Sequence, residues 1–155
     1  MQEHETQAID ALLRLGARPS LSAAAGLGDA QRVRELLTRH DATTNGGMWS
    51  PEIGDAIRSA WYNAAASGHV AVIDALLDAQ VIKANDLVGH GTTALHLAAW
   101  SNHRPLVERL LERGADTTVR DKRYDATAAD WARHGGHDAL AQWLREQADR
   151  REVRS

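Results

Sequence analysis

Apolar residues recur along this chain as a pair of alanines followed later by a pair of leucines. The second and third copies of the pattern lie 34 residues apart, while the step from the first to the second takes 40 residues. A further shift of 34 residues reaches a degenerate fourth copy near the C-terminus. Such recurrence is typical of a repeat protein, in which each unit covers the apolar face of the next. The paired positions are Ala24-Ala25 and Leu36-Leu37, Ala64-Ala65 and Leu76-Leu77, Ala98-Ala99 and Leu110-Leu111, with Ala132 and Leu144 in the fourth copy.

Each copy predicts two helices joined by a tight turn. The first helix is short and rich in alanine, which suits close packing against neighbouring helices on both sides. A glycine at the turn, such as Gly28, Gly68 or Gly136, adopts backbone conformations that other residues resist. The second helix has apolar residues at helical spacing, and in the third copy Pro105 and Gly114 mark its start and its end. The sequence therefore predicts an all-α stack of helix-turn-helix units.

One copy, Gly91–Asp121, resembles an ankyrin repeat. It contains Thr93-Ala94-Leu95-His96, Ala98-Ala99, Leu110-Leu111 and Gly114-Ala115-Asp116, in the order of that family's signature. The resemblance implies an ankyrin-repeat solenoid whose helix pairs are joined by hairpin loops and whose concave face binds partners. It also implies that His96 forms hydrogen bonds with a threonine hydroxyl and the hairpin backbone. By the same resemblance, His69, His103 and His137 at the turns are structural.

The same register divides residues 1–155, taken as one domain, into stacked units. Residues 5–19 are expected to form a half-repeat that caps the N-terminus, because Leu13 and Leu21 stand too close for a hairpin between them. Repeats follow at residues 20–49 (with a long loop), 50–86 and 87–121, and an atypical C-terminal repeat occupies residues 122–147. We expect the charged residues from Glu146 onwards, including a tail at residues 148–155, to fray into solvent.

The connection between the first and second repeats is six residues longer than the others. Within it, Ser50-Pro51-Glu52 favours a helix start, because it combines an N-cap oxygen, a proline at the first helical position and an acid near the positive helix end. Apolar residues from Ile53 to Ala65 then predict a first helix lengthened by about two turns. The insertion is either a tolerated surface loop or a wall that turns an open groove into a pocket.

Composition limits the classes of function. The chain is 43% apolar and 25% charged, which is ordinary for a globular protein, and its net charge of −3 argues against a nucleic-acid partner. Cysteine is absent, so disulfides and thiolate catalysis are excluded. The N-terminal residues contain no long apolar segment, and we expect a cytoplasmic protein that does not enter a membrane. The histidines lack the spacing of metal ligands, so no metal or cofactor is expected.

Candidate binding residues are those that depart from the repeat pattern on the expected concave face. Trp100 and His134 stand 34 residues apart, after the alanine pair, so we expect their backbones to lie about 10 Å apart, the spacing of packed helices. A solvent-facing tryptophan is a typical interface anchor, although Trp100 would also fit beneath the neighbouring hairpin. We expect a monomer that binds a partner protein or peptide. The other candidates, on hairpin tips and the long loop, are His90, Arg123, Tyr124 and Trp49.

A second class of function stays open at Tyr62, His96 and Asp130, which form another column at 34-residue spacing. In a small-molecule-binding protein or unusual enzyme, His96 would act as an acid or base in a pocket near Tyr62 and Trp100. A closed cavity with a perturbed histidine would favour this alternative, and an open groove would favour the interaction module. A third alternative is an oligomerising unit that buries Trp100 between chains.

Overall fold

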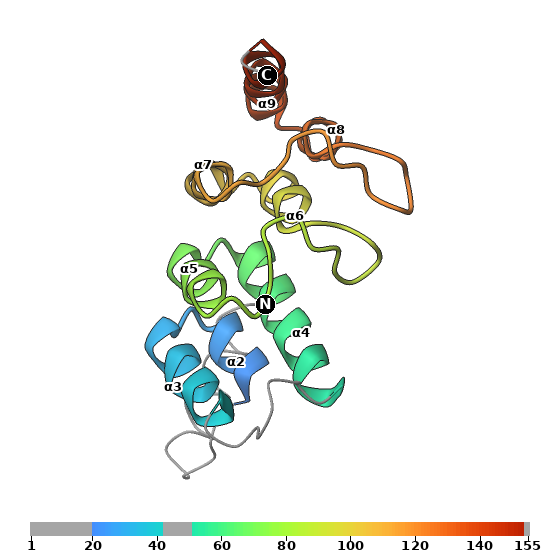
Figure 1. The fold of residues 1–155 in the computed structure, drawn as a ribbon. Helices are drawn as coiled ribbons and strands as arrows, with labels where there is room; N and C mark the ends of the chain where they lie inside the picture. The colour runs from blue at the N-terminus through green and yellow to red at the C-terminus, as the bar shows by residue number, and fades with distance from the viewer. Residues whose placement is uncertain (1–19, 42–50, 154–155) are drawn as a thin grey trace.

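The computed structural model describes residues 20–41 and 51–153, in which all regular structure is helical (Figure 1). One isolated β-bridge, between Val88 and Thr92, closes the hairpin loop before α6 within this described part. The prediction of an all-α fold is therefore confirmed. The helices are α2 (Leu21–Gly26), α3 (Ala30–Asp41), α4 (Pro51–Ser67), α5 (Val70–Asp78), α6 (Ala94–Trp100), α7 (Arg104–Glu112), α8 (Ala128–His134) and α9 (Asp138–Glu152).

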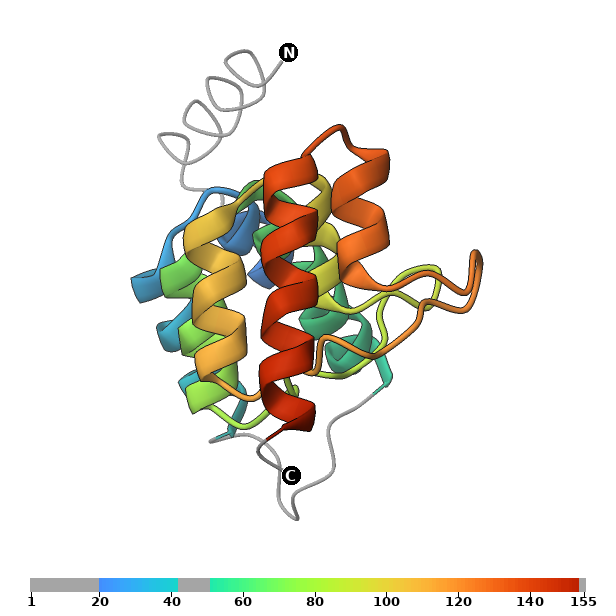
Figure 2. The same cartoon turned by 90° about the horizontal axis from the view of Figure 1, so that it is seen from above.

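The helices form two rows, one from the first and one from the second helix of each pair (Figures 1 and 2). In the first row α4 packs between α2 and α6, and α6 packs between α4 and α8. In the second row α5 packs between α3 and α7. The loops before α6 and α8 extend to the same side of the stack, beside the first row (Figure 1). This is the predicted solenoid of helix pairs joined by hairpin loops.

Small residues allow the first row to pack closely. Ala64, Ala65, Ala98 and Ala99 have no exposed surface, so neighbouring helices press directly against them. The second row contributes larger side chains to the same core, including Val72, Leu76, Leu106 and Leu110. None of the helices within residues 20–41 and 51–153 is both long and apolar enough to cross a membrane.

The turns between paired helices use a left-handed backbone. Gly28, Gly68 and Gly136 have φ angles of 76°, 76° and 81°, which a side chain would strain. In the third repeat the same place is taken by Asn102, with φ of 56°, and asparagine is among the residues that tolerate this region best. The turns predicted from glycine spacing are confirmed.

Histidines beside these turns connect successive repeats. The Nε2 atom of His69 lies 2.9 Å from the carbonyl oxygen of Gly26. His103 makes the same contact with Ala66 at 2.9 Å, and His137 with Trp100 at 3.1 Å. Each bond reaches back to the end of the preceding first helix, where carbonyl groups lack helical partners. The structural role implied for these three histidines is confirmed.

Helix α4 is lengthened, as its apolar spacing predicts. It begins at Pro51 and contains 17 residues, compared with 7 in α6, so the extension exceeds the expected two turns. Ile57, Ala60 and Trp61 on this helix are buried. The long loop at residues 42–49 and the N-terminal half-repeat at residues 5–19 lie outside the described residues, so the repeat boundaries stay predictions.

The C-terminal helix extends further than expected. Fraying from Glu146 onwards is a wrong prediction, because α9 continues to Glu152. Leu140, Ala141 and Leu144 anchor its first half in the core, and the Gln142 side chain donates to Glu146 one turn later. The following residues are mostly charged or amide side chains with good helix propensity, so the helix continues after its apolar contacts end.

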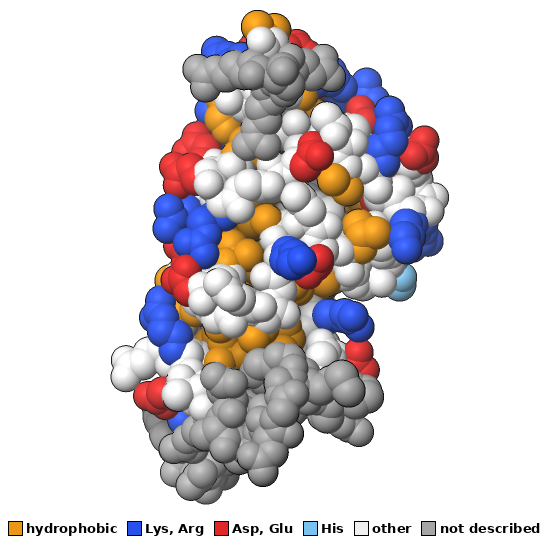
Figure 3. Space-filling view, in the orientation of Figure 1, with side chains coloured by type: hydrophobic (Ala, Val, Ile, Leu, Met, Phe, Trp, Pro, Cys, Tyr) orange, Lys and Arg blue, Asp and Glu red, His pale blue; other side chains and the backbone are white. Residues whose placement is uncertain are grey.

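The outer surface of the second row is covered with ion pairs. Arg109 bonds to Asp74 at 3.0 Å and Arg113 to Asp78 at 2.6 Å, joining α7 to α5 across the repeat boundary. Basic and acidic side chains alternate along this flank, at the left of Figure 3. Because these pairs are exposed to solvent, each contributes only about 0–1 kcal/mol. The flank is a well-solvated surface, in contrast to the opposite side of the stack.

Candidate binding groove

Aromatic side chains from three segments meet on the side of the first row. Trp100 ends α6, Trp131 lies within α8, and Tyr124 belongs to the loop before α8. The indole of Trp131 is central, with its ring centroid 5.8 Å from that of Trp100 and 6.3 Å from that of Tyr124. Interplanar angles of 74° and 62° make both contacts edge-to-face, a favoured geometry for aromatic pairs.

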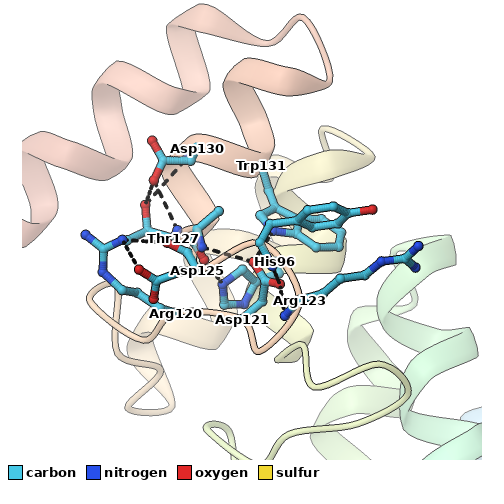
Figure 4. Close-up of polar contacts among 10 residues, drawn as sticks. His96, Arg120, Asp121, Arg123, Asp125, Thr127, Asp130 and Trp131 are labelled. Atoms are coloured by element: carbon cyan, nitrogen blue, oxygen red, sulfur yellow. Dashed lines mark hydrogen bonds and ion pairs between the residues drawn. The ribbon is translucent and has the colours of Figure 1, made fainter.

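The position of Trp131 is set by a hydrogen bond to a buried carboxylate. Its Nε1–H group donates to Asp121 Oδ2 at 2.9 Å (Figure 4). The same carboxylate accepts backbone N–H bonds from Arg123 and Tyr124, both at 2.8 Å, and from Ala126 at 3.1 Å. Asp121 therefore holds the hairpin loop and the central tryptophan in one arrangement.

The protonation of Asp121 follows from these contacts. The side chain is 3% exposed, and burial alone would raise its pKa above the ordinary value of 3.8. Hydrogen bonds from the Trp131 indole and from the backbone of Tyr124, Arg123 and Ala126 outweigh burial and lower the pKa to about 2. The carboxylate is thus charged at neutral pH, as an acceptor of several N–H groups must be.

The aromatic cluster borders a cavity of about 770 Å³. The cavity is open to solvent: Trp100 is 49% exposed and Tyr124 is 63% exposed. Its volume lies in the range of ligand and peptide-side-chain pockets. The lining residues are Trp100, Tyr124, Asp125, Ala126, Asp130, Trp131, Arg133 and His134, and we call this surface the aromatic groove.

Charged groups surround the aromatic groove. Asp130 Oδ1 lies 3.4 Å from Arg145 and 3.7 Å from Arg133, while Asp125 lies 3.5 Å from Arg120. The guanidinium of Arg123 lies over the ring of Tyr124, 5.2 Å from its centroid. The groove therefore combines an apolar floor with a polar rim, which is the usual anatomy of a protein interface.

A family model of ankyrin repeats, in three copies, matches residues 21–121. This chain belongs to the ankyrin repeat family. Ankyrin repeats are generally modules for protein–protein interaction. The ankyrin match ends just before the hairpin loop of α8, so the aromatic groove lies at the junction between the matched repeats and the helix pair that follows them.

The α8 segment nevertheless begins as an ankyrin repeat does. Thr127 and Asp130 form the same capping box that Thr93 and His96 form at the start of α6. Asp130 Oδ2 accepts the Thr127 hydroxyl at 2.9 Å and its backbone N–H at 3.1 Å. An aspartate can replace the histidine because each places an acceptor where the first turn of the helix exposes N–H groups.

His96 has the structural role that the ankyrin resemblance implies. It is 1% exposed, and its Nδ1 atom accepts from the Thr93 hydroxyl at 2.8 Å and the Thr93 backbone at 3.3 Å. Its Nε2–H group donates to the carbonyl oxygen of Ala126 at 3.0 Å. Burial lowers the pKa of His96, and the Ala126 carbonyl opposes this only in part. Both ring nitrogens are occupied and shielded from solvent, so the geometry gives no support to a general base here.

The structure brings together three of the predicted binding residues. Trp100, Tyr124 and His134 line the aromatic groove, and Arg123 borders it through its contact with Tyr124. His90 is exposed in the preceding hairpin loop but does not line the groove. Trp49 lies outside the described residues. The two interpretations of Trp100 are both partly correct, since the indole is half-exposed and also packs edge-to-face on Trp131.

Trp131 is the central residue of the aromatic groove, and sequence reasoning did not select it. The signal was the Asp130-Trp131 pair, which replaces the expected His-Leu pair of the repeat. That departure suggested only an atypical terminal repeat. Its significance depends on Asp121, whose contact with Trp131 belongs to the loop fold and to no periodic pattern.

The alternative pocket near Tyr62 is not formed as expected. Tyr62 is 38% exposed and lies against Gly89, and it does not line the cavity that contains Trp100. A smaller cavity of about 290 Å³ lies between α4 and the loop before α6, with Arg58 and Asp86 in its lining. Within the described residues, no three His, Cys, Asp or Glu side chains gather in a cluster that would hold a metal ion.

Proposed function

We propose that this ankyrin-repeat chain binds a partner protein or peptide in the aromatic groove of its concave face. The observation that carries the proposal is the exposure of Trp100 and Tyr124 around a cavity whose third wall, Trp131, is fixed in place. Large aromatic side chains left partly in water gain free energy when a partner covers them. Tryptophan and tyrosine are also the residues most enriched among interface hot spots.

The groove needs little reorganisation on binding. Trp131 is held by Asp121, and Trp100 and Tyr124 pack against Trp131 at favoured aromatic geometry. A partner therefore meets a preformed surface and loses less free energy to ordering side chains. His134 and Arg123 supply polar contacts at the rim, and His90 would meet only a partner that extends beyond the groove.

Alanine substitution of Trp100 provides the test. We expect Trp100→Ala, alone or with His134→Ala, to weaken capture of a native partner by about 2 kcal/mol, roughly 30-fold in Kd. Affinity capture from the native cell extract identifies the partner, and titration with the purified partner measures Kd. The fold should be retained, because the contact of Trp100 with His137 uses only its backbone carbonyl.

Val153→Ala is the matched control, since Val153 is 88% exposed and does not line the aromatic groove. It should bind like the wild type. If Trp100→Ala, with an unchanged thermal melt, binds the captured partner as tightly as the wild type, the groove is not the binding site.

We also propose that the chain acts as a monomer. The alternative, a dimer that buries Trp100 between two copies, would bury the same aromatic surface. Size-exclusion chromatography separates the two: a dimer that Trp100→Ala converts to a monomer would assign the groove to self-association and would contradict the proposal.

A further inference from the structure

We propose that the partner segment bound in the aromatic groove is acidic and presents one flat apolar side chain between its carboxylates. This inference rests on the proposed function and adds the chemistry of the partner. It comes from two features of the groove, namely an aromatic floor and an excess of guanidinium groups around it.

The floor of the groove suits a flat apolar side chain. Trp100 and Tyr124 both stand at steep angles to Trp131, so the rings form walls that face a common space. A planar or aliphatic side chain entering that space contacts ring faces and edges at the separations preferred by aromatic pairs. Trp131 contributes no free donor there, because its N–H group is bonded to Asp121.

The carboxylates at the groove already have partners. Asp121 is buried and accepts four N–H groups, including that of Trp131. Asp130 is bonded through one oxygen to Thr127, and its other oxygen faces Arg133 and Arg145. Asp125 faces Arg120. A cationic partner segment would therefore compete with existing arginine contacts at each carboxylate.

The guanidinium groups are in excess. Arg133 and Arg145 share a single oxygen of Asp130, at 3.7 and 3.4 Å, so most of their N–H donors stay available. Arg123 contacts the ring of Tyr124 and forms no ion pair with any residue in the described part of the chain. Arginine on an aromatic ring keeps its charge and its planar set of donors for a second partner.

This local charge is opposite to that of the whole chain. The protein carries a net charge of −3, whereas the four arginines at the groove face only Asp125 and Asp130 as exposed carboxylates. The groove is therefore a positive region on a negative molecule. It attracts an acidic segment and repels a basic one, and complementary charge of this kind selects partners as well as speeding their association.

The test uses a library of random peptides, about a dozen residues long, displayed against the full-length chain. Recovered sequences should be enriched in Asp and Glu on both sides of a Trp, Phe, Tyr or Leu. Trp100→Ala should lose these peptides, which places them in the groove. Their affinity should fall as salt rises from about 0.05 to 0.3 M, because exposed charge pairs are screened.

Charge reversal isolates the electrostatic part. The double variant Arg123→Glu with Arg133→Glu should bind the recovered acidic peptides roughly tenfold or more weakly, through loss of complementary charge. Arg34→Glu is the matched control, because Arg34 is an exposed arginine on α3, far from the groove in the stack. It should leave the affinity unchanged, and circular dichroism melts check that all variants fold.

The possible failures are distinguishable. Recovered peptides that lose binding on Trp100→Ala but are basic or uncharged would overturn this inference and leave the proposed function standing. Peptides of any charge that bind equally well to Trp100→Ala would count against both, as would a library that yields no binder. Acidic peptides insensitive to the Arg123 and Arg133 reversals would overturn the role given to these arginines.

Discussion

At the scale of single residues, Asp121 has the largest effect on the groove. One carboxylate accepts N–H groups from three backbone positions of a hairpin loop and from the indole of Trp131. It is buried, so each of these bonds lies largely outside competition with water. The loop before α8 and the aromatic floor therefore depend on the same negative charge.

We predict that Asp121→Asn lowers the free energy of unfolding by about 1–3 kcal/mol, because the amide keeps one acceptor oxygen and turns the other into a donor among donors. The difference from the wild type should also depend on pH. The pKa of Asp121 is about 2 in the folded protein and 3.8 ordinarily, so its contribution is present above pH 3.8 and is lost as the pH falls towards 2.

Urea unfolding of both proteins across this pH range measures that difference. The gap between wild type and variant should be widest near neutral pH and should narrow below pH 4. A gap that stays constant from neutral pH down to pH 2 would show that the charge of Asp121 is not what stabilises the loop.

At the scale of elements, the turn between paired helices determines how closely the repeats approach. A Cβ atom placed on Gly68 would lie 2.7 Å from the ring of His103, which belongs to the next repeat. The same atom on Gly136 would meet nothing within 4 Å. The glycines therefore have different roles, although their φ angles of 76° and 81° are nearly the same.

This pair of sites separates backbone strain from inter-repeat contact. We predict that Gly136→Ala costs about 1–2 kcal/mol, the penalty of a left-handed conformation for a residue with a Cβ atom. Gly68→Ala should cost about 1–3 kcal/mol more, because the His103 ring must also move. Thermal or urea unfolding measures both variants. Equal losses would mean that the His103 ring yields at no cost and that the turn alone requires glycine.

At the scale of the whole molecule, the stack depends on thin helices in the first row. Helix α6 packs between α4 and α8, and Ala98 on it has no exposed surface. A larger side chain there must displace packed neighbours. The second row can hold leucines and valines because its helices cover the stack from one side.

We predict that Ala98→Leu lowers the free energy of unfolding by about 1–3 kcal/mol through overpacking. Ala71→Leu is the control, since Ala71 is exposed on α5, and we expect it to be nearly neutral. Urea unfolding followed by circular dichroism compares the two. A neutral Ala98→Leu would show that the first row has room that its buried surface does not suggest.

Sequence reasoning was most accurate where the physical cause is periodic. The alanine and leucine pairs, the glycine turns and the threonine-histidine capping box all recur at a fixed interval, because each repeat solves the same packing problem. The long helix α4 was predicted from Ser50-Pro51-Glu52 and its apolar spacing for a similarly local reason. The C-terminal helix was underestimated because its later turns lack an apolar stripe.

The sequence alone determined the ankyrin solenoid, the structural role of its turn histidines and Trp100 as a candidate contact residue. Only the tertiary structure decided that Trp131 is the centre of the aromatic groove, and that Arg133 and Arg145 share one carboxylate oxygen. Repeat contacts have a period that sequence preserves. The groove depends instead on the path of a single hairpin loop around Asp121, which brings together residues with no common spacing.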